Sequence, residues 1–247
     1  MFLYNKLDGT IPLSNLMFYQ RFNNSVADQT GNYSVSSSGV TYGNGLYSGV
    51  SNESIVLYSL TDSINIASTA DFTFGNGTVD LPFSVSFTFK AINLGVLNGG
   101  FYNKFLLCNR DNSSDTTKKV WQINTNNSPE PKLNFIFFYQ STGGNKGISC
   151  DTILSNNVTY HITCTYSTLA GMKIYINGTL QTSTAATNGT YVAKESFSNS
   201  IKIGGASWFD DLVMLGNLDG LGIWNVALNH RQVKAIFNKQ ASGLEIL

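Results

Sequence analysis

The chain has 247 residues and a formal net charge of zero, and 13% of its residues are aromatic whereas 12% are charged. Without an excess of basic residues it is not expected to neutralise phosphates, so nucleic acid is not a predicted partner. The longest apolar run, residues 135–139, is far shorter than the roughly 20 residues of a membrane-spanning helix, so membrane insertion is not predicted. Abundant Asn, Ser, Thr and Gly, together with the aromatic residues, favour strands joined by turns.

Residues 1–15 contain Pro12 and show no clear period. We interpret them as an N-terminal arm, which is either a frayed end or a docking segment for a second copy or a virion partner. Residues 16–247 show no linker or internal repeat, so we expect one domain there. The first residues lack the basic start and apolar core of a signal peptide. The expected location is therefore a virion or an extracellular surface reached by another route, or otherwise the cytoplasm.

The first part of the domain is predicted to contain few regular elements. Residues 16–22 form a strand, and Asp28 begins an Asx-type turn in which its carboxylate accepts local backbone amides. Residues 40–60 are rich in Gly, Ser and Tyr and are predicted to be a loop, and residues 63–66 form a short strand.

Residues 83–90 show the clearest period of two in the chain. Phe83 and every second residue after it are apolar, whereas the residues between them are Ser, Thr or Lys. This alternation predicts a strand of an antiparallel sheet with one face in the core and the other in water.

Further strands are predicted at residues 105–108, 120–123, 133–139, 158–166 and 172–176, which brings the total to about twelve. Residues 143–147 are interpreted as a turn, and Asn177-Gly178 as a two-residue hairpin turn that needs positive φ at both positions. His161 lies among threonines on the polar face of its strand, and His230 lies near the start of the last helix. Both are interpreted as surface residues.

The last segment, residues 201–239, is predicted to run strand, loop, strand and helix. Ile201 and Ile203 precede a Gly-Gly turn, and a second, Gly-rich strand carries Trp224. Asn229 is placed as an N-cap with Gln232 as its capping-box partner, so an amphipathic helix follows.

This succession resembles the C-terminal part of laminin-G-like and pentraxin-like jelly rolls of the concanavalin A-like lectin/glucanase superfamily. The matching residues are Gly204, Gly205, Gly216, Leu218, Asp219, Leu221, Ile223, Trp224, Asn225, Leu228, Asn229, Gln232 and Val233. The resemblance implies an all-β fold, an antiparallel two-sheet jelly-roll sandwich with one short C-terminal helix. The strand count favours the same architecture, because no segment between strands has a helical period.

Catalysis is not predicted. Glucanases of this fold carry closely spaced carboxylates on one strand, and none of the four glutamates, Glu53, Glu130, Glu195 and Glu245, has such a neighbour. No nucleophile motif accompanies the two histidines. The three cysteines, Cys108, Cys150 and Cys164, show no metal-binding spacing and are interpreted as buried free thiols.

Binding is the remaining chemistry, since sugar sites combine aromatic rings with Asp and Asn side chains. Candidate ligand-binding residues are Trp208, Phe209, Asp210 and Asp211 in one loop, together with Tyr139 and Asn145. The alternative is that Trp208 or Phe209 folds back on the core and that the two aspartates are solvated.

Asp111 and Asn112 form a second candidate site. This pair resembles the Asp-Asn pair that pentraxins direct at calcium, which implies a single calcium ion as the candidate cofactor. The other half of the pentraxin site departs from the family pattern, because Gly205, Ala206, Ser207 and Trp208 stand where the family carries acidic and amide residues.

Two functions follow from these patterns. The first is a non-catalytic recognition module for a glycan or another host cell-surface ligand, carried on a virus or phage particle. The second is a structural assembly or decoration protein of a virion, whose jelly roll packs against neighbouring subunits.

Overall fold

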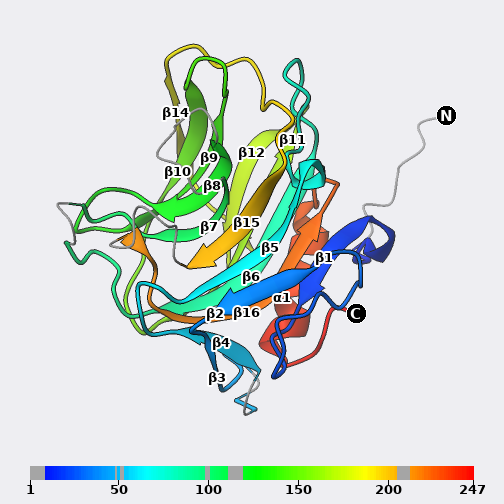
Figure 1. Ribbon diagram of the computed structural model, residues 1–247, viewed down its shortest axis with the longest axis vertical. Helices are drawn as coiled ribbons and strands as arrows, with labels where there is room; N and C mark the ends of the chain where they lie inside the picture. The colour runs from blue at the N-terminus through cyan, green and yellow to red at the C-terminus, as the bar shows by residue number, and fades with distance from the viewer. Residues whose placement is uncertain (1–8, 48, 51–52, 98–100, 111–118, 205–211) are drawn as a thin grey trace.

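The computed structural model describes residues 9–47, 49–50, 53–97, 101–110, 119–204 and 212–247. These residues form a sandwich of two antiparallel sheets with one α-helix near the C-terminus (Figure 1). The jelly-roll-type fold predicted from the sequence is therefore confirmed. Two short 3-10 helices, Leu13–Asn15 and Ala70–Phe72, flank the strands.

Sheet A has the strand order β13-β12-β11-β6-β16-β4-β3, and β1 also pairs with β16. Its strands are β1 (Leu16–Gln20), β3 (Thr41–Gly43), β4 (Ser54–Leu57), β6 (Phe83–Ala91), β11 (Thr159–Ser167), β12 (Gly171–Ile176), β13 (Thr179–Leu180) and β16 (Gly216–Trp224). Asn177 and Gly178 both have positive φ, 51° and 74°, so the predicted hairpin turn between β12 and β13 is confirmed.

Sheet B has the strand order β14-β10-β9-β8-β7-β15-β5-β2. Its strands are β2 (Val35–Ser38), β5 (Ser63–Thr69), β7 (Phe105–Arg110), β8 (Lys119–Thr125), β9 (Lys132–Phe138), β10 (Asn145–Ile153), β14 (Ser183–Asn188) and β15 (Asn199–Gly204). The central strands β7 to β10 are consecutive along the chain. They therefore form a meander, in which each strand pairs antiparallel with the strand that follows it in the chain.

The main core lies between the two sheets. The apolar face of β6 supplies Phe83, Val85, Phe87 and Phe89, all without solvent exposure. The ring of Phe83 stacks on Phe74 with centroids 4.3 Å apart and also contacts the rings of Trp121, Phe135 and Phe137 from sheet B. Burying this aromatic surface is the main force that holds the two sheets together.

Helix α1 (His230–Ala241) covers the outer face of sheet A and makes a second, smaller core. Val233 and Ile236 of the helix pack with Leu228 and with Trp224, which is fully buried. The Asn229 side chain accepts from the N–H of Gln232, and the Gln232 side chain accepts from the N–H of Asn229. The predicted capping box is therefore confirmed.

The prediction that the polar face of β6 lies in water is wrong, and so is the prediction that His161 is a surface residue. Ser84, Ser86 and Thr88 are buried, and His161 has no exposed surface. The His161 ring lies 5.5 Å from the ring of Phe237, and its Nε2 lies 3.0 Å from the hydroxyl of Ser86. Burial lowers the pKa of His161 to about 3, although Gln240 opposes this, so the imidazole is neutral at physiological pH.

Several strands lie where the sequence predicted loops or turns. β3 and β4 occupy part of residues 40–60, and β10 begins at Asn145, inside the segment interpreted as a turn. β2 and β14 consist mainly of small or polar residues, so their sequences show no alternation of apolar and polar positions. The observed strand number is therefore higher than the predicted twelve.

The turn after β1 forms as predicted. Asp28 Oδ1 accepts from the N–H groups of Tyr19 and Thr30, and its Oδ2 accepts from those of Asn32 and Tyr33. These bonds cover the outer edge of β1. The cysteines are buried and free, as expected.

Residues 1–8 of the predicted arm lie outside the described residues. Within the described part of the arm, the Thr10 carbonyl accepts from Gln232 Nε2, and Ile11 packs against the core beneath α1. This part of the arm therefore contacts the chain's own C-terminal helix. Across the described residues, no helix combines the length and the hydrophobicity of a membrane span.

Candidate functional site

The outer face of sheet B, which points away from the core, carries amide side chains in neighbouring strands. Side chains alternate along a strand, and Trp121, Ile123, Phe135 and Phe137 belong to the core. The residues between them therefore project outward, including Gln122 and Asn124 of β8 and Asn134, Ile136 and Phe138 of β9. Gln122 lies opposite Ile136, and Phe138 lies opposite Asn145 of β10, so these side chains form a continuous surface.

A pocket of about 270 Å³ opens on this surface. Its lining residues come from β7 to β10 and from the segments beside them: Phe101, Asn103, Phe105, Lys119, Gln122, Ile136, Phe138, Asn145 and Leu212. We name this set the sheet-B pocket. Lys119 and Leu212 directly follow, in the sequence, residues 111–118 and 205–211 respectively.

The sheet-B pocket combines apolar rings with hydrogen-bonding groups. The Phe101 side chain is 45% exposed, and Lys119 Nζ lies 5.5 Å from the centroid of the Phe138 ring. The Oδ1 atom of Asn103 is buried and has no hydrogen-bond partner among the described residues. Gln122 Nε2 donates to Asn124 Oδ1 at 3.2 Å, which fixes the orientation of the Gln122 amide.

Such a set of groups suits a polar ligand that has apolar faces. Aromatic rings pack on apolar surface, while amide groups both donate and accept hydrogen bonds. A buried acceptor without a partner costs free energy unless a bound group donates to it. The pocket therefore offers rings that suit an apolar face of a ligand and amides that suit its hydroxyl or amide groups.

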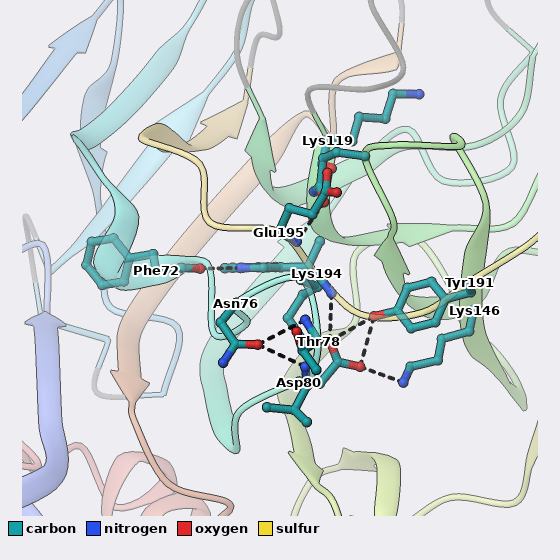
Figure 2. Close-up of polar contacts among 12 residues, drawn as sticks. Phe72, Asn76, Thr78, Asp80, Lys119, Lys146, Tyr191, Lys194 and Glu195 are labelled. Atoms are coloured by element: carbon teal, nitrogen blue, oxygen red, sulfur yellow. Dashed lines mark hydrogen bonds and ion pairs between the residues drawn. The ribbon is translucent and has the colours of Figure 1, made fainter.

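A buried ionic cluster lies on the core side of sheet B, against the ring of Phe137 (Figure 2). Asp80 accepts from Lys194 Nζ at 2.9 Å and from Lys146 Nζ at 2.6 Å, and the Tyr191 hydroxyl lies 2.9 Å from both of its carboxylate oxygens. The Lys194 side chain has no exposed surface, and its Nζ lies 3.6 Å from the centroid of the Phe137 ring. We name Asp80, Lys146, Tyr191 and Lys194 the Asp80 cluster.

The protonation of the cluster follows from its burial and its charges. Burial alone would raise the pKa of Asp80, but the charge of Lys194 and the hydrogen bonds from both lysines hold it below its usual range. Burial lowers the pKa of Lys194 to about 7, although Asp80 opposes this. Burial, together with the charge of Asp80, raises the pKa of Tyr191, so this hydroxyl stays protonated and donates.

A chain of hydrogen bonds links the cluster to the pocket. The N–H of Glu195, next to Lys194, donates to Gln140 Oε1 at 2.8 Å. The Gln140 amide in turn donates to the carbonyl of Lys119, which lines the pocket. On the other side, Lys146 is adjacent to Asn145. The Asp80 cluster therefore fixes two strands that line the pocket, β8 and β10.

Two of the predicted ligand-binding residues are described by the structure. Asn145 lines the sheet-B pocket. Tyr139 lies at the end of β9, where its backbone closes the hairpin to Gly143 and Gly144, and it is not among the lining residues.

The other predicted site residues, Trp208, Phe209, Asp210, Asp211, Asp111 and Asn112, lie outside the described residues. The calcium prediction, which rests on the last two, therefore stays a prediction. In the part of the chain that the structure describes, no group of three or more His, Cys, Asp or Glu side chains is arranged to hold a metal ion.

Most pocket residues were not predicted from the sequence. Gln122 and Phe138 lie in segments that were predicted as strands, but the direction of their side chains was not deduced. A signal was present, since the polar residues Gln122, Asn124 and Asn134 alternate with apolar ones. Phe101 and Asn103 lie in a segment without periodicity, so only the folded chain brings them to the pocket.

Two other hollows are less suited to a ligand. A small, partly open hollow of about 20 Å³ beneath α1, lined by Tyr19, Asp219 and Gln240 among others, has room for about one water molecule. An open groove of about 460 Å³ lies beside β1. Its polar residues Asp71 and Asn225 already accept from Tyr33 and Asn15, so the groove offers fewer groups for recognition.

Comparison with known protein families identifies the fold. The family model described as the concanavalin A-like lectin/glucanases superfamily matches residues 61–234, which is more than half of the chain. The chain belongs to the concanavalin A-like lectin/glucanase superfamily. No curated protein sequence matches the chain.

Several solved protein structures have the same fold as this chain at low sequence identity. The botulinum neurotoxin serotype D ligand-binding domain, solved in complex with N-acetylneuraminic acid, is 18% identical with a TM-score of 0.66, over 92% of this chain and 51% of that one. Domain 4 of AbnA, an extracellular arabinanase from Geobacillus stearothermophilus solved in complex with arabinotriose, is 18% identical with a TM-score of 0.60, over 90% and 98%.

A third similar structure is the binding domain of Paraclostridial Mosquitocidal Protein 1, with 20% identity and a TM-score of 0.66 over 92% of this chain and 52% of that one. The chain therefore spans about half the length of the toxin domains that it matches, whereas it corresponds to nearly the whole of the arabinanase domain.

Proposed function

We propose that this chain is a non-catalytic carbohydrate-binding module whose ligand occupies the sheet-B pocket. The observation that carries the proposal is that one open pocket combines the exposed Phe101 ring, the Gln122 amide and the buried Oδ1 of Asn103, to which no described residue donates. Sugar rings present apolar C–H faces and hydroxyl donors, which match these two kinds of group.

The solved relatives support the same class of ligand. Two of them were solved with a carbohydrate, one with N-acetylneuraminic acid and one with arabinotriose. At 18% identity they do not fix which sugar this chain would take, so the proposal concerns the class of ligand. The place of the module on a virus or phage particle stays a prediction from composition.

The proposal is tested by binding measurements with N-acetylneuraminic acid oligosaccharides and arabinotriose as probes, followed by a glycan array. Phe101→Ala and Gln122→Ala are expected to weaken binding of the best probe by about tenfold or more each, because each removes a principal contact. The matched control is Tyr58→Ala, which removes an exposed ring on the loop after β4 of sheet A that is not among the residues lining the pocket. Its affinity should equal that of the native chain.

Two results would refute the proposal. The first is sugar binding that survives both pocket variants but fails on another surface. The second is release of shorter sugars from the bound probe, which would show that the chain is an enzyme.

A further inference from the structure

Strand β14 is the last strand at one edge of sheet B (Figure 1). It pairs with β10 on one side in unbroken register, from Asn188 opposite Asn145 to Ser183 opposite Cys150. Its residues are exposed apart from Ser183, which is half-buried. Beyond β10, the described residues bond to this strand only through a local contact between the Ser183 hydroxyl and the Gln181 carbonyl.

The alternation of backbone hydrogen bonds shows which groups of β14 face away from the sheet. In an antiparallel pair, only every second residue bonds to a given neighbouring strand. The N–H of Asp151 donates to the Thr182 carbonyl, and on the opposite side of β10 the N–H of Tyr139 donates to the Gly144 carbonyl. Both bonds direct the odd-numbered residues of β10 toward β14.

The register then assigns the groups of β14 itself. The residues opposite Asn145, Gly147 and Ser149 bond to β10, and these are the even-numbered residues 188, 186 and 184. The N–H and C=O groups of Ser183, Ala185 and Thr187 therefore point outward from the edge of the sheet. They form a row of donors and acceptors that an added strand would satisfy.

The other described edges of the two sheets are shorter than the six residues of β14. β1, which branches from β16, has five residues, β2 has four, β3 has three and β13 has two. Proteins block open edges with charged side chains, proline or bulges. β14 has none of these, and the sequence contains no charged residue between Lys173 and Lys194.

We propose that β14 is a dimer interface, in which the strand pairs antiparallel with β14 of a second copy of this chain. A twofold axis at Ala185 places Ala185 opposite its own equivalent and Ser183 opposite Thr187 of the other copy. All three outward-facing positions are then bonded, with two N–H···O bonds for each such pair. Only small, uncharged side chains meet, so neither a clash nor like-charge repulsion opposes the pairing.

Self-pairing has a consequence for binding. The twofold axis of such a strand pair is perpendicular to the sheet, so sheet B continues from one copy into the other with the same face outward. If the proposed function holds, two sheet-B pockets would face the same side and could engage a surface that carries many glycans. The dimer itself does not depend on the proposed function.

The test is the molar mass in solution, measured by analytical ultracentrifugation up to about 100 µM, a range suited to a modest interface. The native chain is expected to form a dimer. Ala185→Pro removes an outward N–H without touching the bonds to β10, so it should give a monomer with nearly unchanged melting temperature. A native chain that stays monomeric over this range, or an Ala185→Pro variant that still dimerises, would overturn the proposal.

Charge exchange provides a second test that does not depend on proline. Ala185→Lys and Ala185→Glu each place like charges opposite one another at the twofold axis, so each variant alone should be monomeric. Mixed together, the two variants should form a dimer, because opposite charges then meet. Monomers in the mixture, or dimers of either variant alone, would show that the copies do not meet at Ala185. Because no sugar is present, these outcomes are independent of carbohydrate binding.

Discussion

At the scale of single residues, Asp80 is the shared acceptor of two lysines, Lys146 and Lys194. The Asp80 side chain is only 2% exposed, and its negative charge balances the positive charge of Lys194, whose side chain has no exposed surface. A buried charge that loses its partner is far more costly than a pair that is replaced together.

Asp80→Asn is therefore expected to destabilise the protein by about 1–3 kcal/mol, because both lysines and Tyr191 lose their charged acceptor, while Lys194, whose pKa is about 7, can release its proton. The measurement is chemical denaturation. Asp71→Asn, at an exposed carboxylate that accepts a hydrogen bond from Tyr33, is the control and should have a much smaller effect. The double variant Asp80→Asn/Lys194→Met should recover part of the loss, and a loss equal to or larger than that of the single variant would contradict this account.

Asp219 gives a prediction for pH. Its Oδ2 accepts from the N–H of Leu46 at 3.1 Å, so it holds the turn after β3. Burial raises its pKa to about 7, while the bond to Leu46 and the charge of Arg21 oppose this. In the unfolded chain the pKa is about 3.9.

Because the folded state binds this proton more tightly, the contribution of Asp219 is fully present below about pH 4 and is lost as the pH rises through about 7. Asp219→Asn keeps an acceptor for Leu46 and removes the ionisation. The stability of the variant minus that of the native chain should therefore rise by roughly 1–2 kcal/mol between pH 4 and pH 8. This figure is smaller than the full pKa shift implies, because solvent screens the charge at a partly exposed site. Denaturation at both pH values measures this, and a stability difference that does not change with pH would refute it.

At the scale of elements, the C-terminal helix shows what local sequence signals can predict. The capping box at Asn229 and the apolar stripe of Val233 and Ile236 were deduced from residue types alone, because caps and helical periods are local. What the helix covers was not deduced. Since α1 packs on the outer face of sheet A, the polar side chains of β6 and His161 are buried, although alternation alone predicts that they are in water.

Asn229→Ala is expected to lower the stability by about 1 kcal/mol, because the N–H of Gln232 loses its acceptor. For a chain of this size the melting temperature should fall by about 2–4 °C. Asn238→Ala, at an exposed position inside the same helix, is the matched control and should leave the melting temperature unchanged or slightly raised. Equal losses in the two variants would mean that the cap does not stabilise the helix.

At the scale of the whole molecule, the sequence predicted the sandwich and its closing strand and helix, because those depend on period, turn chemistry and caps. The strands with weak alternation, such as β14, and the pocket itself were not predicted. Phe101, Gln122 and Asn145 are far apart in the sequence, and only the pairing of β8, β9 and β10 brings the last two onto one face. Of the predicted ligand-binding residues, Asn145 alone is placed at the pocket by the described structure.

The central claim is that the outer face of sheet B binds carbohydrate. It is tested most directly by a nuclear magnetic resonance titration of the labelled protein with the oligosaccharide that binds best. The side-chain amides of Asn103, Gln122 and Asn145 and the backbone of β8 to β10 are predicted to shift together as the sugar saturates, while α1 stays unchanged. Saturating shifts centred on the groove beside β1, or none on sheet B, would contradict the account.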